Sequence, residues 1–520
     1  MNENSENFTE NRGEDAIRAR EQSPQKMSEK PVKKSKTWLP IVIIVVILAA
    51  VTTVALILGG TNSDGGSTLS NNINDTGVNW EKYDGSEIVL SGTGKTSITQ
   101  AGVYTISGEL TDGYLEVNTA GAVKLILNGV KITNNSGPAI YIAEAKLITI
   151  ELAAGSENSL TDGSIYQGWD EDVCATLFSH DDMVLEGSGK LTVTANYEDG
   201  IVGKDDLKIN SGTYVISSKD EGIRGRDSVY IVDGTFDITS GGDAIKSNNS
   251  DEVAKGWIKI DGGTIIASAG DDGIHAESSL EINGGTIAIK KSYEGLEGAK
   301  ITINGGDISV TASDDGINAA GGNDSSSPNM RNYQASSSNY AIIINGGKLH
   351  VSSVGDGIDS NGALTINGGE VSVDGPTNSG NGALDAEGAV TFNGGSLVAV
   401  GASGMAVAPA TSSAGYSISV LFDQTYSAGT VIEVKDTSGN LILSHTSAKT
   451  FQHAVLSSDK FVENGEYTVY VNGEEYTTTK LAEKTTQVGS GMMNGGMGPG
   501  GMNGQMPGQT NGNQGTQRRW

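Results

Sequence analysis

The residues best suited to chemistry are acidic side chains that recur beside glycine. The pairs Asp271-Asp272 and Asp314-Asp315 each stand directly before a glycine that is followed by an isoleucine, and variants of this phrase repeat along the chain. Carboxylates at the same point of stacked repeats would lie about 5 Å apart and would repel one another. Basic neighbours or bound cations are therefore needed to neutralise them.

The candidate cation ligands fall into an earlier and a later group. Few bases accompany the later acids, and closely spaced carboxylates suit Ca²⁺, which takes about six to eight oxygen ligands; solvated surface acids are the alternative. Arg224 and Lys246 accompany the earlier acids, so an ion-pair ladder and a calcium site are both open there. The predicted calcium ligands are Asp271, Asp272, Glu294, Glu297, Asp314, Asp315, Asp356, Asp359 and Asp385 in the later repeats, and Asp199, Asp220, Glu221 and Asp243 in the earlier ones.

No catalytic residue is predicted. The five histidines form no cluster, and His275 is interpreted as a turn residue. A calcium-assisted polysaccharide lyase needs a Lys or Arg that can accept a proton, and Arg224, Lys246, Lys290 and Lys291 are the candidates. Acids on neighbouring repeats should keep these bases protonated. We therefore expect binding without catalysis, with a lyase and a structural or adhesive surface rod as alternatives.

Internal repetition predicts the fold. Asn-Gly-Gly phrases such as those at Asn283, Asn304 and Asn345 belong to a unit of about 22 residues, with insertions in three places. Each unit contains short alternating strands that bury little alone and need neighbours above and below. This pattern predicts an all-β parallel β-helix with one unit per coil. Its glycines should occupy corners where a Cβ would clash, and its asparagines should form a hydrogen-bonded ladder.

Composition and segment boundaries define the domain organisation. The uncharged segment 38–58 would span about 31 Å as a helix, and lysines precede it, so we expect a single-pass membrane anchor with the bulk of the chain outside; a cleaved signal peptide is the alternative. The predicted parts are a cytoplasmic tail (1–37), the transmembrane anchor (38–58), a flexible linker (59–79), the β-helix (80–410), a C-terminal β-domain with hairpin turns (411–485) and a disordered Gly/Met/Asn-rich tail (486–520).

Charge and cysteine content exclude several classes of protein. The formal net charge of −29 opposes nucleic-acid binding over the whole surface. The chain has 73 glycines without a collagen period, and its one cysteine, Cys174, excludes a disulfide framework. The oligomeric state stays open.

Several motifs in order carry a resemblance to a known family. The runs Leu177–Asp182, Asp199–Ile201, Lys204–Ile209 and Asp220–Asp227 resemble the bacterial family of carbohydrate-binding domain-containing proteins, and the likeness covers about residues 80–480. The resemblance implies a right-handed, pectate-lyase-like parallel β-helix, calcium sites formed by corner aspartates, and binding of cellulose and acidic sugars at the cell surface.

The residues and the resemblance together predict a non-catalytic protein of the bacterial cell membrane. We expect it to bind an acidic polysaccharide such as polygalacturonate or pectin, and also cellulose, through a calcium-loaded face. The aromatic residues Tyr293, Tyr333, Tyr340 and Trp257 are candidates for stacking on sugar rings, although Trp257 opens a strand and suits a core position equally.

Overall fold

The computed structural model describes residues 77–320 and 339–489. The expected membrane anchor at 38–58 lies outside the described residues and stays a prediction, as do the segments 1–37 and 490–520. Among the described residues, no helix is long and apolar enough to cross a membrane.

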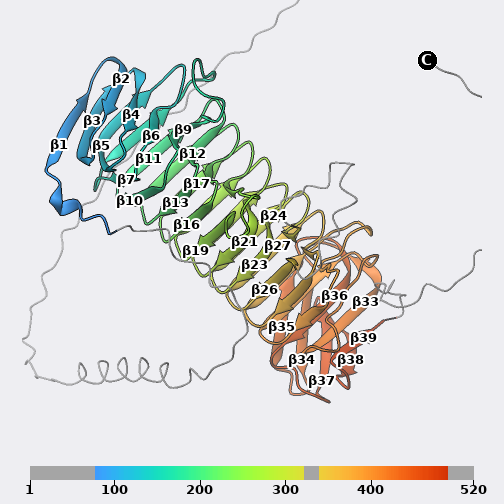
Figure 1. Cartoon of the computed structure of the whole chain (residues 1–520). Helices are drawn as coiled ribbons and strands as arrows, with labels where there is room; N and C mark the ends of the chain where they lie inside the picture. The colour runs from blue at the N-terminus through green and yellow to red at the C-terminus, as the bar shows by residue number, and fades with distance from the viewer. Residues whose placement is uncertain (1–76, 321–338, 490–520) are drawn as a thin grey trace, which may run out of the picture. The chain divides into compact units, whose positions relative to one another are not determined.

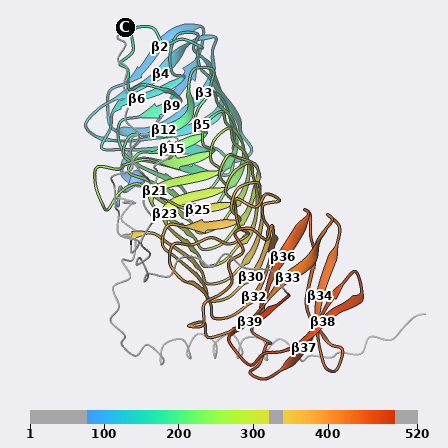
Figure 2. The same ribbon diagram turned by 90° about the vertical axis from the view of Figure 1, so that its right-hand side faces the viewer.

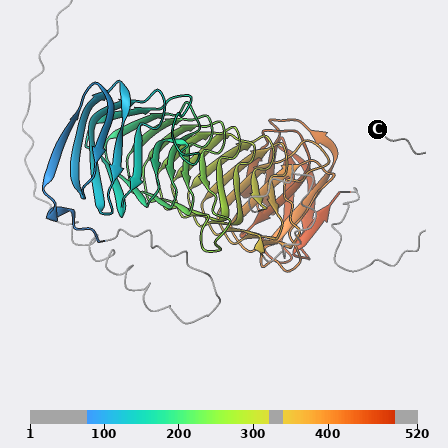
Figure 3. The same ribbon diagram turned by 45° about the horizontal axis from the view of Figure 1, so that its top comes forward.

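Short parallel strands stacked in three faces make up most of the described chain (Figure 1). Each coil contributes one strand to each face, and strands of successive coils pair in parallel, as the coils seen side by side in Figure 3 illustrate. Apart from one short 3-10 helix, η1 (Trp80–Lys82), every regular element is a strand. The predicted all-β fold with a largely parallel sheet is therefore confirmed, and the structure is β-helix-like. Its handedness stays a prediction.

The first face carries the acidic corners and runs down Figure 2. It consists of β2 (Thr93–Ile98), β4 (Asp112–Asn118), β6 (Ile140–Glu144), β9 (Ala175–Ser179), β12 (Asp199–Gly203), β15 (Ile223–Gly225), β18 (Ile245–Ser247), the first halves of β21 (Ile274–Ile282) and β23 (Leu296–Ile303), β25 (Ile317–Ala319) and β28 (Ile358–Ser360).

The second face follows the first in each coil. It consists of β1 (Gly85–Leu90), β3 (Gly102–Leu110), β5 (Ala122–Thr133), β7 (Leu147–Leu152), β10 (Met183–Gly187), β13 (Asp206–Ile209), β16 (Ser228–Ile231), β19 (Trp257–Ile260), the second halves of β21 and β23, β26 (Ala341–Ile344), β29 (Ala363–Ile366) and β31 (Val390–Phe392).

The third face closes each coil. It consists of the ends of β3 and β5, then β8 (Glu157–Thr161), β11 (Lys190–Thr194), β14 (Thr213–Ser217), β17 (Thr235–Thr239), β20 (Thr264–Ser268), β22 (Thr286–Lys291), β24 (Asp307–Ala312), β27 (Lys348–Ser353), β30 (Glu370–Asp374) and β32 (Ser396–Gly401).

One continuous apolar core fills the coils because apolar and polar residues alternate in each strand. In β17, Phe236 and Ile238 point inward and are buried while their neighbours are exposed. Tyr214 of the preceding coil stacks on Phe236 with ring centroids 5.1 Å apart. Each strand buries only one to three side chains, so a coil gains its stability from the coils on both sides.

The Asn-Gly-Gly corners have the conformation that the sequence predicts. Gly285 has a φ of +91°, and a Cβ on it would lie 2.8 Å from the carbonyl oxygen of Gly263 in the preceding coil. A side chain would therefore meet both backbone strain and a close approach between coils. This explains why the corner requires glycine.

The predicted asparagine ladder is confirmed. Its members are Asn283, Asn304, Asn345, Asn367 and Asn393, and in each step the Nδ2 group donates to the Oδ1 atom of the preceding asparagine at 2.7–2.9 Å. The first member, Asn283, donates to Asp261 Oδ1 at 2.7 Å. The ladder joins coils whose sequence separation differs, including the one interrupted by residues 321–338.

Antiparallel strands follow the last coil. β36 (Phe451–Ser458) pairs antiparallel with β32, the last strand of the third face, and with β33 (Tyr416–Tyr426), which also pairs with β39 (Thr485–Val488). A separate four-stranded sheet contains β34 (Val431–Asp436), β35 (Leu441–Thr446), β37 (Glu466–Val471) and β38 (Glu474–Lys480). The hairpin turns predicted at Ser438–Asn440 and Asn472–Gly473 join β34 to β35 and β37 to β38. β36 thus covers the edge of the last coil.

Candidate functional site

A row of carboxylates lies at the corner that leads into each strand of the first face. Asp243 Oδ1 accepts a hydrogen bond from the backbone N–H of Asp272 at 2.8 Å, and Asp272 Oδ1 accepts one from the N–H of Glu294 at 3.1 Å. Asp315 Oδ1 likewise accepts from the N–H of Asp356 at 2.6 Å. One oxygen of each carboxylate thus ties two coils together, while the second is free for another partner. This corner row contains Asp199, Glu221, Asp243, Asp272, Glu294, Asp315 and Asp356.

A second row lies three residues further along, on the strands themselves. Strand register aligns its members directly above one another, and the residue before each of them belongs to the apolar core, so the row faces away from the core. A bridge between Ile358 and Leu384 continues the alignment to Asp385. The strand row, in chain order, is Tyr141, Phe178, Val202, Arg224, Lys246, His275, Glu297, Asn318 and Asp359, so it changes from aromatic through basic to acidic.

Side-chain cations neutralise the earlier part of the corner row. Arg224 Nη2 lies 2.6 Å from Asp199 Oδ2, and Lys246 Nζ lies 2.6 Å from Asp243 Oδ2 and 3.1 Å from Glu221 Oε1. Burial opposes the charged forms of Arg224 and Lys246, but these carboxylates outweigh it and raise the pKa of both bases. For the earlier repeats, the contacts favour the ion-pair alternative over a calcium site.

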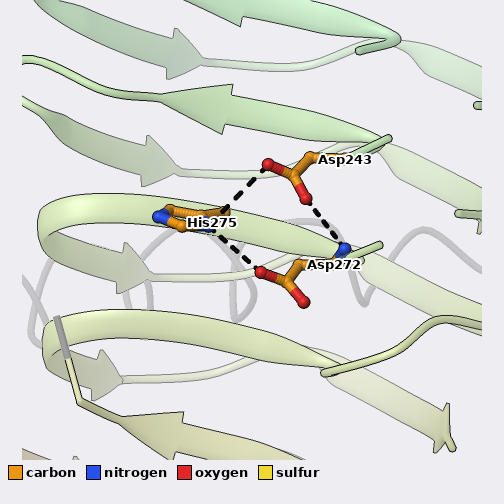
Figure 4. A group of neighbouring side chains, drawn as sticks. All are labelled: Asp243, Asp272 and His275. Carbon is orange, nitrogen blue, oxygen red and sulfur yellow. Dashed lines mark hydrogen bonds and ion pairs between the residues drawn. The ribbon is translucent and has the colours of Figure 1, made fainter. Parts of the chain in front are cut away.

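His275 is the third side-chain cation of the row (Figure 4). Its Nδ1 atom lies 2.8 Å from Glu297 Oε2, 3.1 Å from Asp272 Oδ2 and 3.7 Å from Asp243 Oδ2, and the ring is buried. Burial lowers the pKa of His275, but Asp272 and Glu297 outweigh it and raise that pKa to about 11. The interpretation of His275 as a turn residue is wrong: it lies on β21 and is an imidazolium that holds three carboxylates.

Beyond His275 the acids lack such partners. Two groups have oxygens within 4.8 Å of one another, Asp272 with Glu294 and Glu297, and Asp315 with Asp356 and Asp359. Among the described residues, no Lys, Arg or His forms an ion pair with Glu294 or with any member of the second group.

Burial and mutual repulsion change the protonation of these carboxyls. Burial, followed by repulsion from Glu297 and Asp272, raises the pKa of Glu294 to about 9. Burial, with repulsion from neighbouring carboxylates, raises the pKa of Asp315 and of Asp359 to about 7, and that of Asp356 to about 6. The later acids are therefore an uncompensated anionic cluster that a bound cation would stabilise.

The donor atoms of this cluster fit Ca²⁺. All are oxygens, the ligand type that hard divalent cations prefer. Asn318 lies between Glu297 and Asp359 in the strand row, and its Nδ2 group donates to Glu294 Oε2 at 2.8 Å. Its Oδ1 atom is buried and has no hydrogen-bond partner among the described residues. A buried carbonyl oxygen without a donor is consistent with a ligand to a cation.

The remaining predicted ligands lie beside these groups. Asp220 is exposed and joins Asp199 and Glu221 in a third group of acids near Arg224 and Lys246. Asp271, Asp314 and Asp385 do not belong to any of the compact groups found in the described part of the chain, and Asp385 Oδ1 accepts from the N–H of Ala386. Their assignment as ligands stays a prediction.

The structure changes the list of candidate aromatic residues. Tyr293 is 44% exposed, Tyr340 is half-buried, and Trp257 is only 8% exposed because it packs into β19; Tyr333 lies outside the described residues. The sequence reasoning missed a cluster in the N-terminal coils, formed by Tyr114, Tyr141 and Trp169. Tyr141 shares the strand row with Arg224, but the looser repeat spacing before residue 195 hides that alignment in the sequence.

Comparisons with known proteins agree with the resemblance in the sequence. Residues 93–332 match the family model described as carbohydrate-binding domain-containing protein. A relative with the same name from Acetivibrio thermocellus is 37% identical over 146 residues, which cover 27% of this chain and 50% of the relative. The chain thus spans about half the length of the curated relative that it matches.

A solved structure is similar over a smaller part of the chain. It is the gadolinium derivative of the polysaccharide lyase-like protein from C. thermocellum, with a TM-score of 0.36, 37% identity, and coverage of 41% of this chain and 84% of that one. The family match extends from β2 to beyond β25 and includes both rows up to Asn318. Through these residues, the chain belongs to the family of carbohydrate-binding domain-containing proteins.

Proposed function

We propose that this protein is a non-catalytic binder of acidic polysaccharide that holds its ligand through calcium at the later part of the two rows. The segment 38–58 would anchor it in a bacterial cell membrane with the coils outside. The observation that carries the proposal is the uncompensated, oxygen-only cluster from Glu294 to Asp359 on one face of a chain in a carbohydrate-binding family.

The acids and the amide would share the work of holding the cation and the sugar. Glu294, Glu297 and Asn318 offer oxygens on one side, and Asp315 and Asp359 on the other. When bound, Ca²⁺ would neutralise these carboxylates and bridge them to the carboxylates of a uronate polymer. Without neutralisation the face would repel such a polymer. Because successive coils repeat along the axis, an extended chain laid along the face would meet similar groups at regular intervals.

The bases in the rows have no free capacity to take a proton. Arg224, Lys246 and His275 each contact carboxylates and have a raised pKa, so all three are protonated at neutral pH. A lyase needs a base that is deprotonated when the substrate binds. This supports binding over cleavage at this face.

Retention on an anionic polysaccharide tests the proposal. We expect the full-length chain, in mild detergent, to be retained on immobilised polygalacturonate in calcium and released by EDTA. The double change Asp315→Asn and Asp359→Asn should weaken calcium-dependent retention about tenfold or more, since each carboxylate contributes charge and a ligand. The matched control is Asp220→Asn, because Asp220 is an exposed acid beside two side-chain cations.

Two results would contradict the proposal. Retention that EDTA does not change would remove calcium from the account. Release of unsaturated uronides, followed by their ultraviolet absorbance, would show that the chain is a lyase.

A further inference from the structure

Three aromatic rings gather on the first face, away from the acidic cluster. Tyr114 on β4 and Tyr141 on β6 belong to adjacent coils of the face that Figure 2 shows. Trp169 reaches them from the connection between β8 and β9. Its ring centroid lies 4.9 Å from that of Tyr114 and 5.1 Å from that of Tyr141, with interplanar angles of 71° and 77°. All three side chains are half-buried, so each keeps part of its surface in solvent.

The connection that carries Trp169 is held in place at several points. Trp169 Nε1 donates to the carbonyl oxygen of Ser136 at 3.0 Å, and the ring lies so close to Gly137 that a Cβ there would come within 2.1 Å of Nε1. Tyr166 donates to Asp162 Oδ2 at 3.0 Å and stacks on Tyr197 with centroids 4.3 Å apart. The Trp169 ring is thus fixed before any ligand arrives, which lowers the entropic cost of binding.

The charges around these rings are mostly negative. Asp170, Glu171 and Asp172 directly follow Trp169 and are exposed. The cations nearby, His180 and Lys204, both lie 3.8 Å from Asp172. A negatively charged sugar would be repelled here unless a cation intervened. A neutral sugar would meet no such penalty, and the C–H groups on its flat face pack favourably on aromatic rings.

We propose that Tyr114, Tyr141 and Trp169 form a second glycan site that binds a neutral β-linked polysaccharide by stacking and needs no metal ion. This proposal rests on the proposed function only in assuming that the chain binds polysaccharide. The adjacent coils place the tyrosines at about the strand spacing of 4.8 Å, a step comparable in length to one sugar residue of an extended chain. The phenol hydroxyls and the neighbouring carboxylates can accept and donate hydrogen bonds at the sugar edge.

The competing explanation is that Trp169 only covers the small apolar cluster around Val173, Phe178 and Val202, against which it packs. The two explanations differ in their effect on affinity. A cover contributes to stability alone, whereas a stacking platform contributes to affinity even where stability is unchanged.

Binding of neutral glucan in EDTA tests the second site. We expect the full-length chain, in mild detergent, to bind microcrystalline cellulose and soluble cellohexaose with EDTA present. Tyr114→Ala and Trp169→Ala should each weaken cellohexaose binding about tenfold, while Tyr114→Phe, which keeps the ring, should stay close to the wild type. Thermal unfolding of every variant separates loss of fold from loss of affinity.

The controls keep the two sites distinguishable. Tyr230→Ala should not change cellohexaose binding, because the Tyr230 ring lies between Lys208 and Lys259 and is not free to stack on a sugar. The double change Asp315→Asn and Asp359→Asn should affect polygalacturonate and leave cellohexaose unchanged. Absence of neutral-glucan binding, or wild-type affinity in both Tyr114→Ala and Trp169→Ala, would overturn the second site without touching the calcium-dependent one.

Discussion

His275 is the residue at which the strand row changes from cationic to anionic, and it acts there as a built-in counterion. Its Nδ1 atom contacts three carboxylates from three coils, a position that Arg224 and Lys246 fill in the coils before it. The sequence places His275 in this row, two residues after a glycine, but it does not reveal whether that position ends a turn or begins a strand. Only the parallel register of β18, β21 and β23 shows that the ring points at the acids.

Replacing this counterion should destabilise the fold. We expect His275→Gln to lower the free energy of unfolding by about 3 kcal/mol in EDTA, because it leaves Asp243, Asp272 and Glu297 buried without their cation. Urea titration of the full-length chain measures the change. His350→Gln is the control, since the His350 side chain is 45% exposed and its loss should cost well under half as much. Equal effects of the two changes would contradict the role assigned to His275.

At the scale of the element, the coil corners show which glycines the fold requires. Gly285 and Gly439 have similar positive φ angles of +91° and +82°, but only Gly285 lies against another coil; a Cβ on Gly439 meets nothing within 4 Å. The same substitution at the two positions therefore separates backbone strain from the clash between coils.

We expect Gly285→Ala to cost clearly more stability than Gly439→Ala. The second change should cost about 1 kcal/mol from strain alone, and the first about 1–3 kcal/mol more, because coils must move apart to accept the methyl group. Differential scanning calorimetry of the two variants provides the measurement. Equal losses would mean that the coils yield without cost.

A buried histidine predicts acid sensitivity in the antiparallel strands. His453 on β36 is 2% exposed and bonds to Ser419 Oγ at 2.9 Å, and burial lowers its pKa from 6.5 to about 4. Between these two values the unfolded state binds the additional proton, so stability falls as the pH falls. From pH 6.5 to pH 5 the loss should be about 2 kcal/mol.

Hydrogen exchange of the β33 and β36 amides as a function of pH tests this expectation. His453→Gln should remove that part of the pH dependence, whatever it does to stability at pH 7. The same slope in wild type and variant would show that other groups cause the loss.

At the scale of the whole described chain, repetition made the architecture predictable and its absence limited the prediction. The Asn-Gly-Gly period fixed the coils and the ladder in advance, since stacking requires the same residue at the same corner. The connection from Asp162 to Cys174 has no counterpart in the other coils, so nothing in the sequence indicated that it would bring Trp169 to Tyr114. The unpaired acids could be predicted as a group, but their partners depend on register.

The antiparallel strands protect the end of the stack. β36 pairs along the whole length of β32 and buries Val398 and Val400. A chain that ends at residue 410 would expose this strand edge together with its apolar side chains. We expect that chain to associate or aggregate in size-exclusion chromatography with light scattering, whereas a chain ending at residue 489 should behave like the full-length protein. A monodisperse short chain with the size of a monomer would contradict the protective role.

The asparagine ladder also gives the stack a direction. Every side-chain amide donates toward the preceding coil, so the amide dipoles all point the same way and add along the axis. Asp261 ends the series because a carboxylate accepts a hydrogen bond but has no N–H to pass on; its other oxygen accepts from the Tyr230 hydroxyl. An added coil can therefore join this series only if it brings an asparagine in the same orientation, and a coil with an aspartate at that corner would stop it.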